Sequence, residues 1–323
     1  MRIAVIGAGG TGGLYGAILA RGGADVVFVA RGAHLAAIRA RGLQVRSKLF
    51  GEFTVAAEAS DDPAVIADSQ VILFCTKTYD AHSALERLVP VLPEAALVIP
   101  IQNGIDGANE MRRLVSEARV LGGVALGGGV ITEPGVVEER FGALKVIFGE
   151  WAGGMSDRVR ELEIALRGHG LDVEATKDIQ AAVWEKFIIA CAFSGLTALT
   201  RLPIGEILRC EATADLYAEV MREVERLSRA AGVAVRPSFS DHGLTMTRAL
   251  RETATSSMYY DLMAGRRLEL EAINGAAVRL GRELGVPTPH NTVIYAALKP
   301  YSNGSPLGAT DTTSTGPSGS SGG

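Results

Sequence analysis

Short, nearly continuous apolar runs recur along the first third of the chain. The first two runs are each followed by a stretch in which apolar residues lie three and four positions apart. Runs of this kind are typical of strands in a parallel sheet that is covered on both faces. The pattern therefore predicts an α/β fold that opens with a strand-helix-strand unit of a doubly wound sheet. The predicted strands cover residues 2–6, 25–30, 71–75 and 96–101, and the predicted helices cover residues 13–21 and 33–41.

The character of the sequence changes twice after this region. Between residues 119 and 150, short runs punctuated by glycine predict antiparallel strands that complete the same sheet. From residue 176 helical periodicity dominates, so we predict a Rossmann-type N-terminal domain over residues 1–175 and an all-helical C-terminal domain over residues 176–301. Residues 302–323 are mainly Gly, Ser and Thr, and we predict a disordered tail there. The helices expected in the second domain cover residues 178–199, 213–231, 240–251, 268–284 and 291–298.

Composition narrows the class of protein. The 323 residues are 47% hydrophobic and 21% charged, which suits two folded domains and excludes a mainly disordered chain. The net charge is −4 with scattered Lys and Arg, so neither a nucleic acid nor an anionic membrane is an expected partner. The three cysteines are widely spaced and the five histidines show no metal-ligand spacing, so we expect no disulfide framework and no metal site. The expected compartment is the cytoplasm.

A glycine motif follows the first predicted strand and opens the first helix. It runs from Gly7 through Gly9, Gly10 and Thr11 to Gly12 and fits the pattern G-x-G-x-x-G. The first glycine permits a tight turn, the second lets the backbone approach a pyrophosphate, and the third lets helix and strand pack closely. A purely structural turn is the alternative reading. The strand before the motif and the helix after it favour a dinucleotide site.

The end of the second predicted strand bears on the choice of dinucleotide. An acidic residue about 20 positions after the motif would hold a ribose 2′-hydroxyl, but none occurs between Asp25, at the start of that strand, and Glu52. Arg31 stands at the end of the strand instead, and its guanidinium suits a 2′-phosphate. The predicted cofactor is therefore NADP(H), with a solvated loop arginine as the alternative reading of Arg31.

Further motifs carry a family resemblance. Lys77 and Asn103 lie just beyond two predicted strands, where ligands bind in open α/β sheets. In order along the chain the motifs are Thr76-Lys77-Thr78, Gln102-Asn103-Gly104, Trp184-Glu185-Lys186, Ser256-Ser257-Met258 and the run from Glu269 to Asn274-Gly275. Over about residues 1–300 this succession resembles the ketopantoate reductase (2-dehydropantoate 2-reductase) family.

The resemblance implies an activity and a set of site residues. Enzymes of the family reduce a 2-oxo acid with NADPH between a Rossmann domain and a helical domain. Lys186 matches the family's catalytic lysine, Glu269 its catalytic-site glutamate and Ser257 its substrate-binding serine. Lys77 and Asn103 are expected near the ribose, the nicotinamide and the substrate. Asp261 lies four residues after Ser257, so both are expected to face the cleft as substrate-binding residues.

The chain departs from the family pattern at three positions. Pantoate-forming members commonly carry Asn where this sequence has Ala190, Ser194 and Ile204. Lys186, Ala190 and Ser194 are four apart and share one helical face, which makes Ser194 a further substrate-binding candidate. Because a methyl group cannot replace the hydrogen bonds of a carboxamide, a more apolar 2-oxo acid or another carbonyl compound is an alternative substrate to ketopantoate.

The chemistry of hydride transfer assigns a role to Lys186. Negative charge develops on the carbonyl oxygen, and a lysine ammonium within hydrogen-bond reach stabilises and then protonates it. Apolar neighbours would lower the pKa of Lys186, whereas Glu269 would raise it. A surface lysine is the alternative reading. At the level of the whole chain, the alternatives are a hydroxy-acid dehydrogenase of the 6-phosphogluconate dehydrogenase type and an NADPH-binding sensor. A homodimer is compatible with the sequence.

Overall fold

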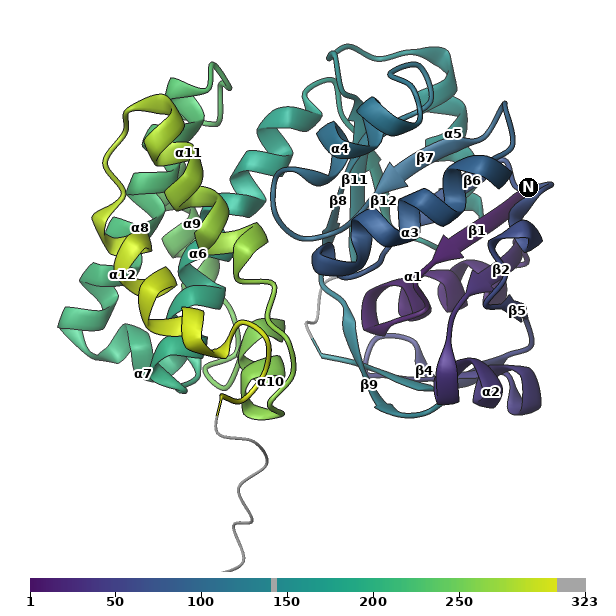
Figure 1. Ribbon diagram of the computed structural model, residues 1–323, viewed down its shortest axis with the longest axis horizontal. Coiled ribbons are helices and arrows are strands. Elements are labelled where there is room, and N and C mark those ends of the chain that lie inside the picture. Colours follow the sequence, from purple (N-terminus) through teal and green to yellow (C-terminus); the bar gives the residue numbers. More distant parts are fainter. Residues whose placement is uncertain (141–143, 307–323) are drawn as a thin grey trace, which may run out of the picture.

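The computed structural model describes residues 1–140 and 144–306, and it shows two lobes joined by one long helix (Figure 1). The N-terminal lobe is built on a five-stranded parallel sheet with the order β5-β2-β1-β6-β7. This confirms the predicted α/β fold with a doubly wound sheet. The strands are β1 (Arg2–Ile6), β2 (Asp25–Val29), β5 (Glu58–Ser60), β6 (Val71–Phe74) and β7 (Leu97–Pro100).

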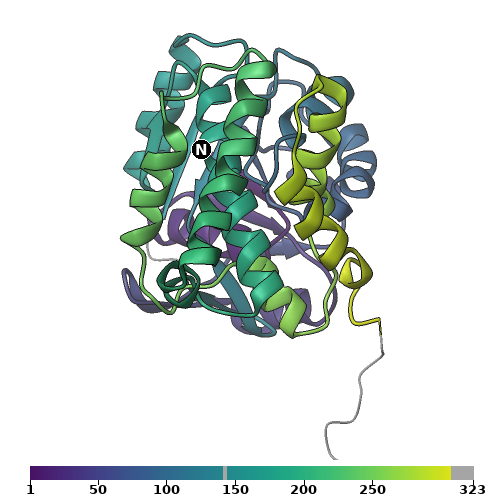
Figure 2. The same cartoon turned by 90° about the vertical axis from the view of Figure 1, so that its left-hand side faces the viewer.

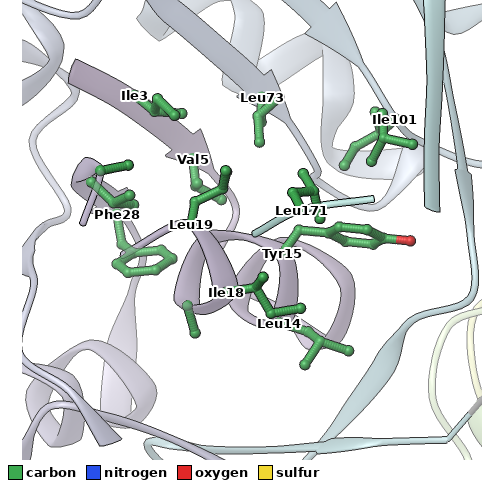
Figure 3. Packing of buried hydrophobic residues seen from close by; sticks show 14 of the residues in the cluster. Ile3, Val5, Leu14, Tyr15, Ile18, Leu19, Phe28, Leu73, Ile101 and Leu171 are labelled. Atoms are coloured by element: carbon green, nitrogen blue, oxygen red, sulfur yellow. The ribbon is translucent and has the colours of Figure 1, made fainter. Parts of the chain in front are cut away.

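Alternate residues of the central strand β1 enter two different cores. Ile3 and Val5 pack with helix α1 (Gly10–Arg21), whereas Ala4 and Ile6 belong to the core on the opposite face. Figure 3 shows the first of these cores, with the side chains of α1 lying under the sheet. The helices on the opposite face are α3 (Ala81–Leu88) and α4 (Gly107–Leu114). Coverage of both faces explains why these strands read as continuous apolar runs.

The carboxyl ends of the parallel strands meet at one edge of the sheet. Ile6 at the end of β1 is in register with Val29 of β2 and with Phe74 of β6. Phe74 is in turn in register with Pro100 of β7. The loops that follow these four strands are therefore neighbours, although they are far apart in the sequence.

The expectation that residues 119–150 complete this sheet is wrong. Their strands are antiparallel pairs, as predicted, but they belong to two other sheets, with the orders β4-β3-β10-β9 and β12-β11-β8. One isolated bridge, between Val98 and Val120, links this region to β7. The strands are β3 (Leu43–Ser47), β4 (Gly51–Val55), β8 (Leu121–Leu126), β9 (Gly129–Glu133), β10 (Val136–Glu139), β11 (Lys145–Glu150) and β12 (Val173–Ala175); helices α2 (Gly32–Arg41) and α5 (Asp157–Gly168) complete the lobe.

The second lobe is helical and is organised around α6 (Ile179–Thr200). This helix is apolar and long enough to cross a membrane, but 61% of its apolar window is buried inside the lobe. Figure 2 shows the other helices arranged around it. They are α7 (Ile204–Arg209), α8 (Glu211–Ala230), α9 (Phe239–Arg248), α10 (Ser257–Met263), α11 (Ala276–Leu284) and α12 (Pro289–Leu298).

The predicted helix over residues 268–284 is helical from Glu271 to Leu284, but it is not α-helical throughout. It begins with the π-helical turn η4 (Glu271–Gly275), in which Gly275 N donates to Leu270 O across five residues, and continues as α11. The short helices α7 and α10 are too brief for their periodicity to be recognised. The predicted tail begins within the described part of the chain, where Ser302 O accepts from Leu268 N at 3.0 Å. Residues 307–323 of that tail lie outside the described residues.

Candidate active site between the two lobes

The glycine loop has the shape that the motif requires. Gly7 has a φ of +93°, and a Cβ there would lie 3.0 Å from Thr76 N, while a Cβ on Gly12 would lie 2.2 Å from Gly7 O. In contrast, a Cβ on Gly9 would meet nothing within 4 Å. Helix α1 begins immediately after Gly9 without a side-chain cap or an acidic residue in its first turn. The first helical turn is therefore open to an anion such as a pyrophosphate.

Two neighbours hold this loop in place, and the motif alone does not reveal them. A Cβ on Gly10 would lie 1.9 Å from Gly129 O, so this glycine is required by the approach of β9. His34 lies on α2, with its Nε2 2.8 Å from Ala8 O and its Nδ1 accepting from Gly135 N at 3.0 Å. Burial lowers the pKa of His34, and this hydrogen-bond pattern requires the neutral ring with the proton on Nε2. His34 therefore fixes the loop and is not a base.

Arg31 lies at the end of β2, where the sequence analysis expected it. Its side chain is 81% exposed and pairs with Asp80, with 2.5 Å between Nη2 and Oδ2. Asp80 belongs to the turn η2 (Thr78–Asp80), which follows β6. Asp80 does not stand out in the sequence, because it lies 49 positions after Arg31, beyond helix α2 and the strands β3 to β6.

Lys77 joins the two lobes. Its Nζ lies 2.8 Å from Asp261 Oδ2 and 3.0 Å from Glu269 Oε2, and both carboxylates belong to the helical lobe. Glu269 also accepts from Thr78 N at 3.1 Å and from Asn103 Nδ2 at 3.1 Å. Glu269 thereby fastens the loops after β6 and β7 to the helical lobe.

The charges in this cluster are stable at neutral pH. Burial alone would lower the pKa of Lys77, but Glu269 and Asp261 more than compensate and raise it. Burial alone would likewise raise the pKa of Glu269, but Lys77 and the hydrogen bonds from Thr78 and Asn103 lower it. The Lys77 cation and the Glu269 carboxylate therefore coexist at the boundary between the lobes.

Lys186 behaves differently from Lys77. It lies on α6, half-buried, and among the described residues no hydrogen bond or ion pair to its ammonium is found. Burial lowers its pKa from 10.5 to about 8, while Glu269 opposes this effect more weakly. Of the two effects on this pKa that were expected from the sequence, burial is therefore larger than the effect of Glu269. An unpaired lysine with a pKa near neutrality is suited to donating a proton.

The remaining candidates occupy α10 and the same face of α6. Asp261 reaches the cluster through Lys77 and also accepts from Arg266 Nε at 2.9 Å. Ser256, not Ser257, caps α10, because its hydroxyl accepts from Tyr259 N at 3.0 Å. Ser257 is half-buried at the first position of the helix. No hydrogen bond within the described ranges joins Ser257 or Ser194 to the Lys77 cluster.

The three departures from the family pattern lie at buried or half-buried positions. Ser194 and Ile204 are buried and Ala190 is half-buried.

Asn274, in the π-helical turn after Glu269, donates to Cys191 O and to Asn291 Oδ1, both at 3.0 Å. The turn that follows Glu269 is thereby fixed to α6, the helix that carries Lys186.

The combination of an uncapped helix start, a half-buried lysine with a lowered pKa and an anchored carboxylate suits hydride transfer to a carbonyl group. In residues 1–140 and 144–306 there is no group of three or more His, Cys, Asp or Glu that could hold a metal ion. The family model described as ketopantoate reductase PanE/ApbA matches residues 3–153, and the model for its C-terminal part matches residues 178–302. The chain belongs to the ketopantoate reductase family.

Relatives of this ketopantoate reductase family member match over nearly its whole length. A 2-dehydropantoate 2-reductase of Halobacterium salinarum is 31% identical, covering 90% of this chain and 95% of the relative. The crystal structure of a 2-dehydropantoate 2-reductase from Geobacter metallireducens is 32% identical with a TM-score of 0.86, covering 93% of this chain and 99% of that one. A PanE/ApbA family ketopantoate reductase from Ralstonia eutropha is 31% identical, also with a TM-score of 0.86, covering 94% of this chain and 98% of that one.

Membership in this family distinguishes an enzyme from a sensor, two classes of protein that the sequence left open. The family consists of NADPH-dependent oxidoreductases that act on CH–OH groups, and the chain is an enzyme of this class. The alternative of an NADPH-binding sensor without catalysis is therefore excluded. The residues present fit the cofactor, because the space at Gly9 is open and the start of α1 is uncapped.

Proposed function

We propose that this protein reduces a 2-oxo acid to the 2-hydroxy acid with NADPH, and that the substrate is 2-dehydropantoate, which is converted to pantoate in pantothenate biosynthesis. The observation that carries the proposal is the environment of Lys186. It is a half-buried lysine with a pKa of about 8, close to the charged cluster around Glu269. Such a group is protonated often enough at neutral pH to serve as an acid and releases its proton easily.

The proposed mechanism assigns each residue a separate task. When bound, NADPH supplies the hydride for the carbonyl carbon. Lys186 donates a hydrogen bond to the carbonyl oxygen, stabilises the negative charge that develops there and transfers its proton to the resulting alkoxide. Glu269 keeps enough negative charge nearby to hold Lys186 partly protonated.

The pairing of Lys77 and Asn103 with Glu269 supports a positioning role for these two residues. Both lie just beyond the carboxyl ends of strands, and both contact Glu269 of the helical lobe. Thr76, which precedes Lys77, lies against Gly7 of the glycine loop. We assign Gly7, Gly9, Gly10, Thr11 and Gly12 to the pyrophosphate and Arg31 to the 2′-phosphate. Substrate contacts are assigned to Asn103, Lys186, Ser194, Ser257 and Asp261.

The wider setting is proposed on the same basis. The partner is a small 2-oxo acid, the compartment is the cytoplasm, and the working form is compatible with a homodimer. The division of labour follows the two predicted domains, with residues 1–175 binding the dinucleotide and residues 176–301 carrying Lys186 and most substrate contacts. A supporting feature is that the strands end at Ala175 and α6 begins at Ile179.

A turnover assay tests the proposal. Oxidation of NADPH is followed by absorbance with ketopantoate and with 2-oxo acids of increasing apolar bulk. Saturable turnover of ketopantoate that disappears in Lys186→Met supports both the activity and the acid. Turnover of none of these acids would refute the proposal.

One observation favours a second substrate class. Ile204 is buried and Ala190 is half-buried, so the region where pantoate-forming members carry Asn is less polar here. Loss of amide groups penalises a hydroxylated substrate more than an apolar one. A 2-oxo acid with a larger apolar side chain is therefore the alternative that the same panel detects.

A further inference from the structure

The ion pair between Arg31 and Asp80 lies at the proposed 2′-phosphate site. Arg31 Nη2 and Asp80 Oδ2 are 2.5 Å apart, and the two side chains are 81% and 31% exposed. Among the described residues, Asp80 is the partner of the Arg31 guanidinium. The group assigned to the phosphate is therefore already facing a carboxylate.

The side chain of Asp80 does not cap the helix that follows it. It stands at the N-cap position of α3, where an aspartate side chain usually accepts from the backbone of the first turn. Its carboxylate makes no such bond. The backbone of Asp80 closes the turn to Lys77 O at 2.9 Å, which leaves the side chain free to reach across to Arg31.

The topology explains how this pair forms. The ends of β2 and β6 are in register with the same residue of β1, Ile6, so the loops that follow them are neighbours. The chain lacks an acidic residue at the end of β2, but the loop after β6 brings one to the same place. The position has both features of a dinucleotide selector, a cation for a phosphate and a carboxylate for a ribose hydroxyl.

We propose that Asp80 determines cofactor selectivity by opposing Arg31, so that the site accepts NADH as a second dinucleotide beside NADPH. This deepens the proposed function, because it rests on the dinucleotide site assigned above. A 2′-phosphate at Arg31 would lie beside the Asp80 carboxylate and be repelled by it. A ribose 2′-hydroxyl would instead find a hydrogen-bond acceptor.

Exposure of the pair limits the size of the effect. An exposed ion pair contributes little to stability, so Arg31 can leave Asp80 for a phosphate at small cost. An unopposed guanidinium-phosphate contact raises affinity by about ten- to a hundredfold. With Asp80 opposing it, we expect the wild-type preference for the 2′-phosphorylated nucleotide to be less than about tenfold.

The test uses fragments that cannot react. Adenosine 2′,5′-bisphosphate and adenosine 5′-monophosphate differ only in the 2′-phosphate, and their dissociation constants are measured by calorimetry on the full chain. We expect Asp80→Asn to tighten the bisphosphate by about three- to tenfold and to leave the monophosphate unchanged or weaker. Asp80→Ala is expected to shift the ratio of the two constants in the same direction.

A matched control lies at the other end of the same strand. Asp25 begins β2 and pairs with Arg2 at 3.1 Å, so Asp25→Asn removes the same charge from an ion pair far from the carboxyl edge. This control should leave the ratio unchanged. The proposal is overturned if neither Asp80 variant raises the ratio, or if the wild type prefers the bisphosphate by a hundredfold or more. Neither fragment contains a nicotinamide, so these results stand even if ketopantoate is not the substrate.

Discussion

Glu269 Oε2 lies 3.0 Å from Lys77 Nζ. The two residues are 192 positions apart in sequence, and their contact joins the two lobes. The same carboxylate accepts from Asn103 and from the backbone of Thr78. Two loops of the nucleotide-binding lobe are thus fixed by one side chain of the helical lobe. Removal of this buried carboxylate should therefore affect both the position of these loops and the charge of the site.

The first prediction concerns the proton donor. Lys186→Met should lower kcat by about 10²- to 10⁴-fold, the usual contribution of a positioned acid, while NADPH still binds. Steady-state kinetics and a fluorescence titration of NADPH measure the two quantities. Lys177→Met is the matched control, because Lys177 is exposed just before α6 and should be replaceable without loss. Near wild-type kcat in Lys186→Met would remove Lys186 from the mechanism.

The second prediction is a pH dependence. Reduction requires the protonated ammonium of Lys186, and its pKa is about 8, so kcat/KM for the 2-oxo acid should fall as the pH rises through about 8. Oxidation of the hydroxy acid requires the neutral amine and should rise over the same interval. A reduction rate that stays level up to about pH 10 would contradict the assignment, because an ordinary lysine titrates there.

The third prediction separates the charge of Glu269 from its shape. Glu269→Gln keeps an acceptor for Thr78 N but removes the negative charge that raises the pKa of Lys186. The fall in reduction rate should therefore move to a pH below about 8. Glu271→Gln is the control, since Glu271 is exposed two residues later and pairs with Lys299. A profile that does not move would show that Glu269 has no electrostatic influence on the acid.

The fourth prediction distinguishes two adjacent glycines. Gly9→Ala should leave the Tm nearly unchanged, because its φ is −70° and the space for the Cβ is open, yet it should weaken NADPH binding about tenfold or more by filling the pyrophosphate position. Gly10→Ala should instead destabilise the fold by about 1–3 kcal/mol, because its Cβ would meet Gly129 O. Thermal unfolding and nucleotide titration of both variants test this contrast. Equal effects on both quantities would argue against a cofactor role for Gly9.

The fifth prediction concerns the substrate. If the amides of pantoate-forming members hold the hydroxyl or carboxylate of ketopantoate, the double variant Ala190→Asn, Ser194→Asn should improve kcat/KM for ketopantoate relative to a larger apolar 2-oxo acid. A Tm near that of the wild type must accompany the measurement, because Ser194 is buried. An unchanged ratio, with efficient turnover of ketopantoate by the wild type, would show that the departures are neutral.

The parallel sheet was predictable because its strands are buried on both faces. Val71–Phe74 is apolar at every position, and each residue is buried. The strand Gly51–Val55 has one buried residue among five and pairs only with a neighbour in a small separate sheet. Polar and apolar residues alternate in it only from Glu52 to Val55, the shortest alternation that indicates a strand, so it is hard to distinguish from a loop. The assignment of residues 119–150 to the main sheet failed for a related reason, since antiparallel pairing does not specify which sheet a pair joins.

The residues of the site could be predicted from sequence motifs, but the contacts between them could not. The glycine motif fixes the loop locally, so its geometry follows from a few consecutive residues. The pairing of Lys77 with Asp261 spans 184 positions and depends on how the lobes dock. The carboxylate beside Arg31 could not be predicted, because the motif specifies an acidic residue at the end of the same strand as Arg31. Asp80 lies instead in the loop after a different strand, β6.

The π-helical turn after Glu269 makes the site sensitive to chain length as well as to residue identity. In an α-helix each residue advances the side chain by about 100° around the axis, so removing one residue from this turn would rotate Glu269 relative to α11 by about that angle. Its carboxylate would then turn away from Lys77 and Asn103. A deletion of one codon between Leu270 and Ala276 would thus break the contacts of Glu269 with Lys77 and Asn103, although every side chain assigned to the site would still be encoded.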